Sequence, residues 1–151
     1  MFQKFQFAFL LLLTLGFATS CDHHVDCFEG EGNEASPSTM LTDGIWDLGW
    51  VRSTEIAGGQ AIETNTEAFG EGTTNGVCTF EFQPELECIM IDVGGEQIND
   101  YRVFENGDLR IGGTTYRIQN LSADVLEILA FESHDCEEGS EGIEELMHFN
   151  R

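Results

Sequence analysis

The feature that most constrains the fold is a series of short segments in which apolar and polar residues alternate. These segments are rich in β-branched and aromatic residues and span 45–51, 77–82, 86–93, 101–104, 109–111, 114–119 and 125–131. Turn-forming residues separate them, and one pair, Asn106–Gly107, is typical of a type I′ hairpin turn. No segment has a long helical period. The pattern therefore predicts an all-β antiparallel fold, a sandwich or a barrel.

One domain, residues 41–151, contains all of these segments. At roughly 110 residues it can bury a single hydrophobic core. About eight strands are what an up-and-down barrel needs to close and to remove its unpaired edges, so a small antiparallel barrel is the predicted architecture. Residues 57–75 are rich in Gly, Thr and Asn and predict a long loop with one weak strand at Ala61–Glu63. Glu141–Met147 is the nearest approach to an amphipathic helix.

The first 20 residues have the order of a secretory signal peptide. Lys4 precedes an apolar run from Phe5 to Phe17, and the small residues Ala18–Ser20 follow it. A transmembrane anchor is the alternative, but the run is shorter than the roughly 20 residues needed to cross a bilayer. The sequence therefore predicts export of a mature chain that begins at Cys21.

Cys21 lies directly after the predicted cleavage site. The segment Ala18–Cys21 resembles the lipobox of bacterial lipoproteins, whose cysteine is acylated, although the box usually has Leu where Ala18 stands. The resemblance implies attachment to a membrane through the acyl chains of Cys21, and two or three chains suffice for stable attachment. A soluble secreted protein with a free Cys21 is the alternative.

The residues behind Cys21 bear on the location. Their acidic composition resembles the export signals of surface-displayed lipoproteins, whereas Asp22 resembles an inner-membrane retention signal of other groups. We therefore expect the bacterial outer membrane or cell surface, with a periplasm-facing position as the alternative.

The cysteine count also favours lipidation of Cys21. The chain has five cysteines, an odd number for an exported protein. Lipidation leaves four, which can form two disulfides in an oxidising compartment.

Those four cysteines permit a specific pairing. Cys78 and Cys88 flank a predicted hairpin with equal parity, so we expect them to pair across it. Cys27 would then pair with Cys136. A tight two-residue turn would instead place Cys78 opposite Ile91.

The mature chain is strongly acidic. After cleavage it keeps all 28 acidic residues against five arginines, 23 net negative charges, and it has no lysine. Such a chain repels the phosphate backbone of nucleic acids and the headgroups of anionic lipids. We therefore exclude nucleic acid as a partner and interpret the charge as a solvated surface. Attraction of divalent cations or cationic partners is the alternative.

Residues 21–40 predict a flexible acidic tether, because they contain few apolar residues and no periodicity. His23, His24 and Cys27 lie within it and have side chains of the kind that bind zinc or copper. Adjacent histidines in a flexible segment are not preorganised, so we expect no metal there and no cofactor in the chain.

The motifs of the common catalytic classes are missing from the sequence. It contains no Gly-x-Ser-x-Gly, no phosphate-binding glycine loop and no His-Glu-x-x-His. His134 and Asp135 are adjacent, and in a strand they would point to opposite faces and would not orient each other. We therefore expect a protein that is not an enzyme.

Several pieces resemble the lipocalin-like domains of bacterial lipoproteins. Asp43–Leu48 resembles the opening Gly-x-Trp strand, Cys78–Phe82 resembles the second major strand, and Ile118–Ile128 has the cadence of the later hairpins. The chain departs from the family in residues 57–75 and in the turn at Gln83–Glu85. The resemblance implies a lipocalin-like barrel over residues 41–151.

The same resemblance implies roles for two residues. Trp46 would plug one end of the barrel, and Arg151 on the last strand would stack against it. A guanidinium over an indole is worth about 0.5–2 kcal/mol. A frayed, unstacked C-terminal arginine is the alternative.

Two functions suit a tethered barrel. In the first, the interior binds a small apolar ligand and is lined by Trp50, Phe80, Phe82, Tyr101, Tyr116 and Phe131. In the second, side chains fill the interior and the protein acts through its surface, as an interaction or structural lipoprotein. The family resemblance favours the first function, and the small size of the domain favours the second.

Overall fold

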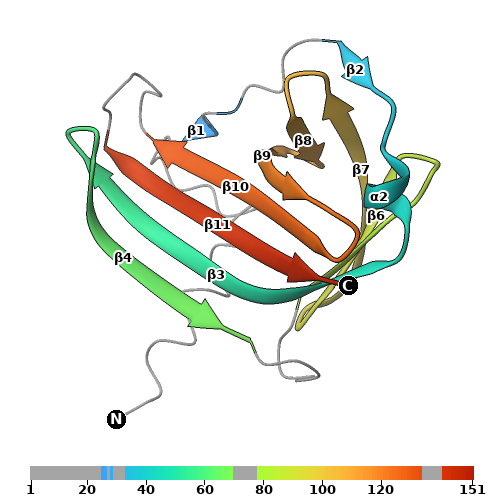
Figure 1. Ribbon diagram of the computed structural model, residues 1–151, viewed down its shortest axis with the longest axis horizontal. Helices are drawn as coiled ribbons and strands as arrows, with labels where there is room; N and C mark the ends of the chain where they lie inside the picture. The colour runs from blue at the N-terminus through green and yellow to red at the C-terminus, as the bar shows by residue number, and fades with distance from the viewer. Residues whose placement is uncertain (1–24, 27, 29–32, 70–77, 134–140) are drawn as a thin grey trace.

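The computed structural model describes residues 25–26, 28, 33–69, 78–133 and 141–151. Within them the chain is almost entirely β-sheet (Figure 1). The elements are β1 (Val25–Asp26), β2 (Glu34–Ala35), α2 (Thr39–Thr42), β3 (Ile45–Ala57), β4 (Gln60–Ala68), β5 (Thr79–Phe82), β6 (Glu87–Asp92), β7 (Gly95–Phe104), β8 (Asp108–Ile111), β9 (Thr114–Leu121), β10 (Val125–Ser133) and β11 (Gly142–Asn150).

Eight of the strands bond to one another in a closed ring. The order is β3, β5, β6, β7, β8, β9, β10 and β11, and β11 returns to β3. Every pairing in the ring is antiparallel. Neighbours in the ring are neighbours in sequence, apart from the inserted β4. The predicted all-β antiparallel fold is confirmed, and its strands close into a ring as an up-and-down order requires.

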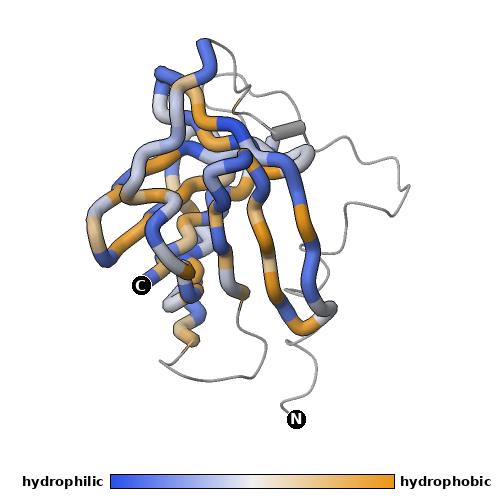
Figure 2. Tube along the Cα trace, turned by 90° about the vertical axis from the view of Figure 1, so that its right-hand side faces the viewer, coloured by the Kyte–Doolittle hydropathy of each residue, from blue (hydrophilic) through white to orange (hydrophobic). Residues whose placement is uncertain are grey.

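The ring encloses the hydrophobic core, and alternation along its strands builds that core. In β10, Leu126, Ile128 and Ala130 are buried while the residues between them are only partly so. Figure 2 shows a similar alternation of hydrophobic and hydrophilic residues along several strands. Trp46 and Phe149, from β3 and β11, are fully buried in the same core. Each such side chain contributes about 1.5–3 kcal/mol by burial, so apolar stabilisation is concentrated in the ring.

Four strands continue beyond the ring as an open sheet. β3 pairs with β5 at Ile45–Asp47 and with β4 at Trp50–Ala57, and β11 follows its other edge. We define the open sheet as β4, Trp50–Ala57 of β3, Gly142–His148 of β11 and Ala130–Ser133 of β10. Its outermost strand is β4, at the lower left of Figure 1.

β4 confirms the strand expected at Ala61–Glu63 but is longer, so the expectation of a loop is wrong for residues 60–68, while residues 70–75 lie outside the described ranges. Gly58 and Gly59 have φ of +60° and +72° and join β3 to β4. Positive φ at both turn residues is what a type I′ hairpin needs, and glycine adopts it without strain. β4 then runs for nine residues, all of them exposed. No core residue marks this strand in the sequence, because none of its side chains is buried.

Part of the predicted tether lies on the sheet. β1 pairs with the end of β10, and β2 pairs with the end of β7. Glu34 of β2 forms an ion pair with Arg102 of β7 at 3.4 Å. The ring of Phe28 lies 4.5 Å from the guanidinium of Arg117. The described residues between 25 and 35 are therefore bound to the sheet rather than free of it.

The turn at Asn106–Gly107 also differs from the type I′ prediction. Gly107 has a φ of +88°, whereas Asn106 does not have a positive φ. The amide of Gly107 donates to the carbonyl of Phe104 at 3.0 Å, as in a three-residue loop that ends on a left-handed glycine. The amide side chain of Asn106 is then free to donate to the buried carboxylate of Asp108 at 2.8 Å.

Candidate functional site

Side chains fill the ring interior, where a ligand was one of the two expectations. Phe80, Phe82 and Tyr101 are at most 2% exposed. Phe82 packs edge-on against Tyr101 with ring centroids 5.1 Å apart, and Phe80 stacks on Phe149 at 4.8 Å. The hydroxyl of Tyr101 donates to the carbonyl of Gln83 at 2.9 Å, so its polar end is satisfied. These three aromatic residues pack against one another and against Phe149 within the hydrophobic core.

Trp50 lies on the opposite face of the sheet from the core. On β3, Leu48 faces Phe149 and Trp50 faces His148, which leaves Gly49 as an unpaired extra residue. A bulge of this kind reverses the alternation of side chains. Val51 is therefore buried in the place that simple alternation assigned to Trp50.

Phe131 and Tyr116 complete the predicted ligand set. Phe131 alternates with the buried Ala130 and points outward, where a Cβ on Gly142 would lie 2.8 Å from its ring. Glycine at position 142 is what allows this close approach. Tyr116 is partly buried against the core. The six predicted residues therefore belong to the core and to the outward face, and they do not surround one cavity.

One end of the ring is closed by Trp46 and Arg151. Trp46 is fully buried, and its indole N–H donates to the carbonyl of Leu41 in α2 at 2.9 Å. The guanidinium of Arg151 lies 4.6 Å from the centroid of the Trp46 ring, the stack that the lipocalin resemblance implied. Arg151 also donates to the carbonyls of Asp43 and Ala123. The arrangement ties the C-terminus across the end of the core.

The predicted disulfide between Cys78 and Cys88 is wrong, because both are free, buried thiols. The β5–β6 hairpin pairs Phe82 with Cys88 and Thr79 with Ile91, so its register does not place the two cysteines opposite each other. Burial raises the pKa of the Cys78 thiol to about 12, and the negative charge of Asp92 adds to this. Burial raises the pKa of Cys88 to about 12 as well, with a further contribution from Cys78.

The remaining predicted cysteine roles involve residues outside the described ranges. Cys21, Cys27 and Cys136 all lie there. Lipidation of Cys21 and a bond between Cys27 and Cys136 therefore stay predictions.

The inward face of the open sheet, which continues from the core, carries a pocket of about 530 Å³. Glu55, Glu63 and Glu141 line it together with the side chains of Ile62 and Ile143. Both isoleucines are substantially exposed, at 58% and 39%. A lining of carboxylates around aliphatic groups suits a ligand that is cationic in one part and apolar in another.

The acidity of the inward face extends to Glu145 on β11. Its carboxylate accepts a hydrogen bond from the hydroxyl of Ser53 at 3.2 Å. Burial raises the pKa of Glu145 above its usual range, and the charge of Glu132 acts in the same direction, while the bond from Ser53 opposes both. A positive group bound near this position would relieve the cost of holding the carboxylate ionised there.

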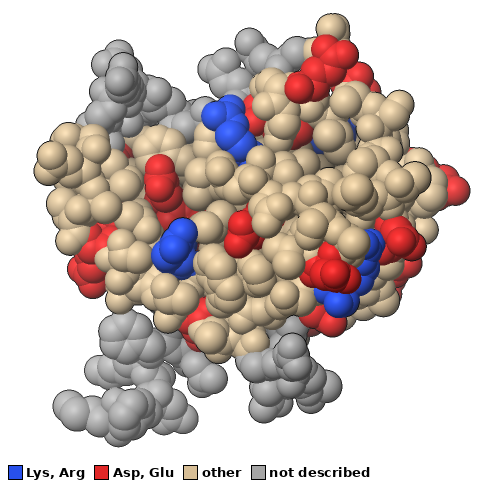
Figure 3. All heavy atoms as spheres, in the orientation of Figure 1, with Lys and Arg blue, Asp and Glu red and all other residues tan. Residues whose placement is uncertain are grey.

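The outward face of the open sheet is less charged. Figure 3 shows this face toward the viewer, with charged groups few and separated. Trp50 stacks on His148 with centroids 4.9 Å apart, and the guanidinium of Arg52 lies 5.6 Å from the indole centroid. The imidazole of His148 is held by Glu127 at 3.0 Å and by Asn150 at 3.1 Å. The hydrogen-bonding groups of His148, Glu127 and Asn150 therefore have partners within this cluster.

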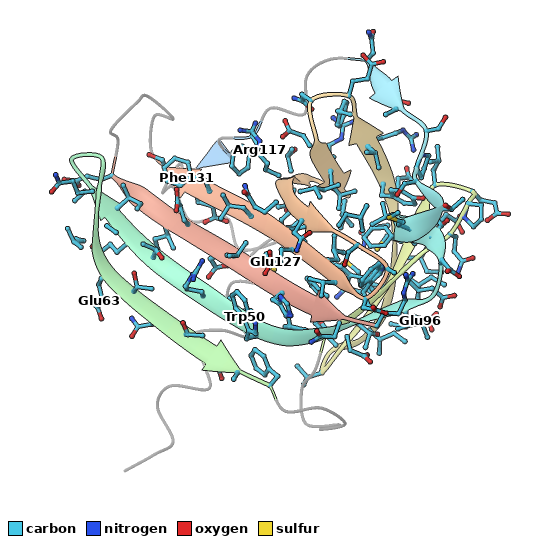
Figure 4. All side chains as sticks on the ribbon, in the orientation of Figure 1. Trp50, Glu63, Glu96, Arg117, Glu127 and Phe131 are labelled. Atoms are coloured by element: carbon cyan, nitrogen blue, oxygen red, sulfur yellow. The ribbon has the colours of Figure 1, made fainter. Side chains whose placement is uncertain are left out.

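A second pocket, of about 370 Å³, lies on the outward surface where the open sheet joins the ring. Arg52, Glu127 and Glu144 line it above the side chains of Leu129 and Leu146. Figure 4 shows Glu127 and Phe131 along β10 and Trp50 on β3, while Glu63 lies out on β4. The pocket is mixed in charge, in contrast to the inward pocket.

The residues of the inward pocket were not predicted as a site from the sequence. Glu55 and Glu63 come together only because β4 folds back on β3, with Glu55 paired to Glu63. The available signal was the Gly58–Gly59 pair followed by a run with no Pro. That signal is weak, since the run contains almost no residues of high strand propensity apart from Ile62 and the threonines.

Comparison of the chain with protein-family models, with curated proteins and with solved structures found no match. In the described ranges, no group of three or more His, Cys, Asp or Glu side chains is arranged to hold a metal ion. None of the helical residues described forms a helix long and apolar enough to cross a membrane.

Proposed function

We propose that this chain is a lipid-anchored, non-enzymatic binding module of a bacterial envelope, and that it binds its ligand on the open sheet rather than inside the ring. Acylated Cys21 supplies the anchor, and the ring supplies a rigid support for the sheet. The lipocalin-like identity belongs to the same proposal. It is supported by the strand order of the ring and by the contact between Arg151 and Trp46.

The observation that carries the proposal is the filling of the ring interior. A ligand site inside a small barrel needs an apolar space of about 300 Å³ or more. The interior positions are instead occupied by side chains such as Phe82, Tyr101 and Phe149, which are at most 1% exposed and contact one another. An eight-stranded ring is just wide enough for side chains to fill it.

The open sheet offers what the interior lacks. It has an inward pocket bordered by glutamates and an exposed strand at its edge. The net charge of the chain leaves attraction of cationic partners as one interpretation, and the carboxylates on the inward face of the sheet suit such partners. A sheet that projects from a folded ring can bind a partner without disturbing the core.

Thermal unfolding in the presence of fatty acids, a sterol and haem tests the choice between interior and surface. We expect no change in Tm with any of them. A ligand that filled the interior at about 100 times its Kd would add about 2.7 kcal/mol to the stability, which corresponds to a rise of several degrees. A saturable rise of that size would return the binding site to the interior and contradict the proposal.

Metabolic labelling with an alkynyl fatty acid tests the anchor separately. The unaltered protein should be labelled and Cys21→Ala should not. Labelling that persists in Cys21→Ala would remove the lipid anchor at this residue, and it would leave the choice of binding surface untouched.

A further inference from the structure

β4 has one edge that pairs with no other described strand. In the part of the chain that the structure describes, β4 pairs with β3 alone. Figure 1 shows it as the outermost strand of the open sheet. An unpaired edge leaves a row of backbone N–H and C=O groups that can bond to another extended chain.

The register identifies which backbone groups are unpaired. The amide of Phe69 donates to the carbonyl of Gly49 at 2.7 Å. Backbone groups of an antiparallel pair alternate between facing the partner strand and facing away from it. Counting back from Phe69, Glu67 and Asn65 therefore direct their backbone groups toward β3, and Thr66 and Thr64 direct theirs toward the open edge.

The edge is long and has no lysine or proline, so its main protection against pairing is the charge of Glu63 and Glu67, which a basic strand would neutralise. Natural edges are commonly short, or carry lysine, proline or a bulge. β4 has nine residues and neither Lys nor Pro, and its register shift lies at its start, opposite Glu55 and Ile56. Two other edges of the sheet are already covered by strands of the chain itself, since β1 pairs with β10 and β2 with β7. This sheet therefore accepts short added strands elsewhere.

Charge decides what kind of strand fits. Side chains of an added strand lie about 4.5–5.5 Å from those opposite them on the same face. On the inward face these neighbours are Glu63, Asn65 and Glu67, with Glu55 one strand further in. On the outward face they are Thr64 and Thr66. Lysine or arginine at alternate positions would meet Glu63 and Glu67, with one such side chain between them beside Asn65, and small or β-branched residues would meet the threonines.

We propose that the β4 edge binds an extended, basic segment of a partner protein by strand addition, with alternate Lys or Arg side chains facing Glu63 and Glu67. The proposal rests on the proposed function, of which it names the ligand class. The backbone bonds would supply the affinity, and the glutamates would select the partner and its register.

Two other occupants fit less well. In a second copy paired antiparallel about Asn65, Glu63 of each chain would face Glu67 of the other, and like charges opposite each other are destabilising. Both copies would also carry the large negative net charge of the chain. The chain's own segment at 21–40 is acidic as well, and its described strands are already paired with β10 and β7.

The test is a binding titration with a blocked, fluorescent heptapeptide in which lysine alternates with valine. We expect saturable binding that weakens as salt rises. Thr66→Pro should weaken it by about tenfold or more, because proline removes an outward N–H while leaving the bonds to β3 in place. The matched variant Thr66→Val keeps the backbone and should bind within about twofold.

Two further arms separate strand addition from simple charge attraction. The double variant Glu63→Gln, Glu67→Gln should weaken binding, and a peptide with glutamate in place of lysine should not bind. A lysine peptide N-methylated at alternate residues should also fail to bind the unaltered protein. This last arm decides the question even if Thr66→Pro does not fold.

Several results would overturn the proposal. They are no binding at millimolar peptide, equal binding of the N-methylated peptide, or a dimer in sedimentation that Thr66→Pro abolishes, which would make a second copy the occupant. Failure here without any stabilising apolar ligand would contradict strand addition alone. A stabilising apolar ligand would contradict the proposed function itself.

Discussion

The two ends of β3 lie in the same strand and yet have opposite environments. In the ring, Trp46 and Leu48 point inward and are at most 4% exposed. In the open sheet, the same inward face carries Ser53 and Glu55, and Glu55 is exposed. The difference follows from what lies across the interior, because the ring places further strands opposite the first half of β3, and no strand among the described residues closes a ring around the second half.

The ring and the open sheet therefore differ in role, since the ring stabilises the fold and the open sheet offers the binding surface. Apolar burial in the ring provides most of the free energy of folding, whereas the open sheet has few buried residues and many exposed backbone bonds. Regions of the second kind have low local stability, and binding surfaces are often drawn from them. We therefore expect substitutions to act on unfolding when they are made in the ring and mainly on binding when they are made in the sheet.

The largest contrast should appear in thiol reactivity. Cys88 is fully buried in the ring, and its raised pKa keeps it as the unreactive thiol. A cysteine introduced by Thr66→Cys lies on the exposed β4. With iodoacetamide at pH 8, Cys88 and Cys78 should react more slowly than the introduced cysteine by a factor of about 1,000 or more, because they react only through unfolding. Peptide mapping by mass spectrometry measures each rate.

The same thiols predict loss of stability at alkaline pH. The pKa of each is raised from 9.0 to about 12 in the folded protein. Their stabilising effect is therefore complete below pH 9 and is lost as the pH rises toward 12, when the unfolded chain releases protons that the folded chain retains. Rapid labelling of Cys88 in the folded protein, or a denaturant midpoint unchanged from pH 8 to pH 11, would contradict a closed ring interior.

The next contrast compares two tryptophans. Trp46→Ala should destabilise the protein by about 3–5 kcal/mol, the cost of deleting a large buried aromatic side chain. It would also remove the partner of Arg151 and the indole bond to Leu41. Trp50→Ala on the outward face should cost about 1 kcal/mol or less, the value of a stacked pair near the surface. Denaturant unfolding gives both numbers, and similar losses would mean that the two regions share one core.

Sequence reasoning succeeded where the ring fixes each residue and failed where it does not. The alternation at 125–131 predicts β10 because its inward residues must be apolar to fill the core. Only Ala61–Glu63 of β4 was expected as a strand, and its full length and its pocket could not be predicted in this way, since none of its nine side chains is buried and its pairing depends on a glycine turn.

The other wrong predictions, for Trp50 and for the cysteine pair, follow from local differences of one or a few residues. One unpaired residue, Gly49, reverses the face of Trp50, and no residue type signals a bulge with certainty. The hairpin turn after Phe82 sets the register that separates Cys78 from Cys88. β11 contains Glu141–Met147 in part, a run whose spacing also suits a short helix, and only its two neighbouring strands make it extended.

A third contrast concerns two carboxylates. Asp108, at the start of β8, has a side chain only 2% exposed and lies 3.0 Å from Arg117. Glu127 pairs with His148 at 3.0 Å and has a side chain 25% exposed. Asp108→Ala should cost about 1–3 kcal/mol, because it leaves donors of Arg117 and Asn106 without their partner while Arg117 can still reach water. Glu127→Ala should cost about 1 kcal/mol or less.

Unfolding of the two variants in urea at pH 7 measures this contrast. An Asp108→Asn variant keeps an acceptor for Arg117 and should recover part of the loss. Equal costs at the two positions would show that the β8 turn is no better protected from water than the outward face.

The smallest expected effect is a gain in stability, whereas the other substitutions should destabilise the protein. Glu145 on the inward face is partly buried and lies near Glu132, so its carboxylate is disfavoured in the folded protein. Its folded pKa is raised, and the associated stability is therefore present in acid and is lost as the pH rises through that pKa.

At pH 7, Glu145→Gln should stabilise the protein by about 0.2–1 kcal/mol, the range for relieving like charges on neighbouring strands. At about pH 3 the gain should vanish, because Glu145 is then largely protonated in both states. Glu144→Gln, on the outward face, is the matched control for net charge. A gain that is the same at both pH values would assign the effect to net charge rather than to the inward face. A loss at pH 7 would instead mean that the bond between Ser53 and the ionised Glu145 outweighs the cost of its burial.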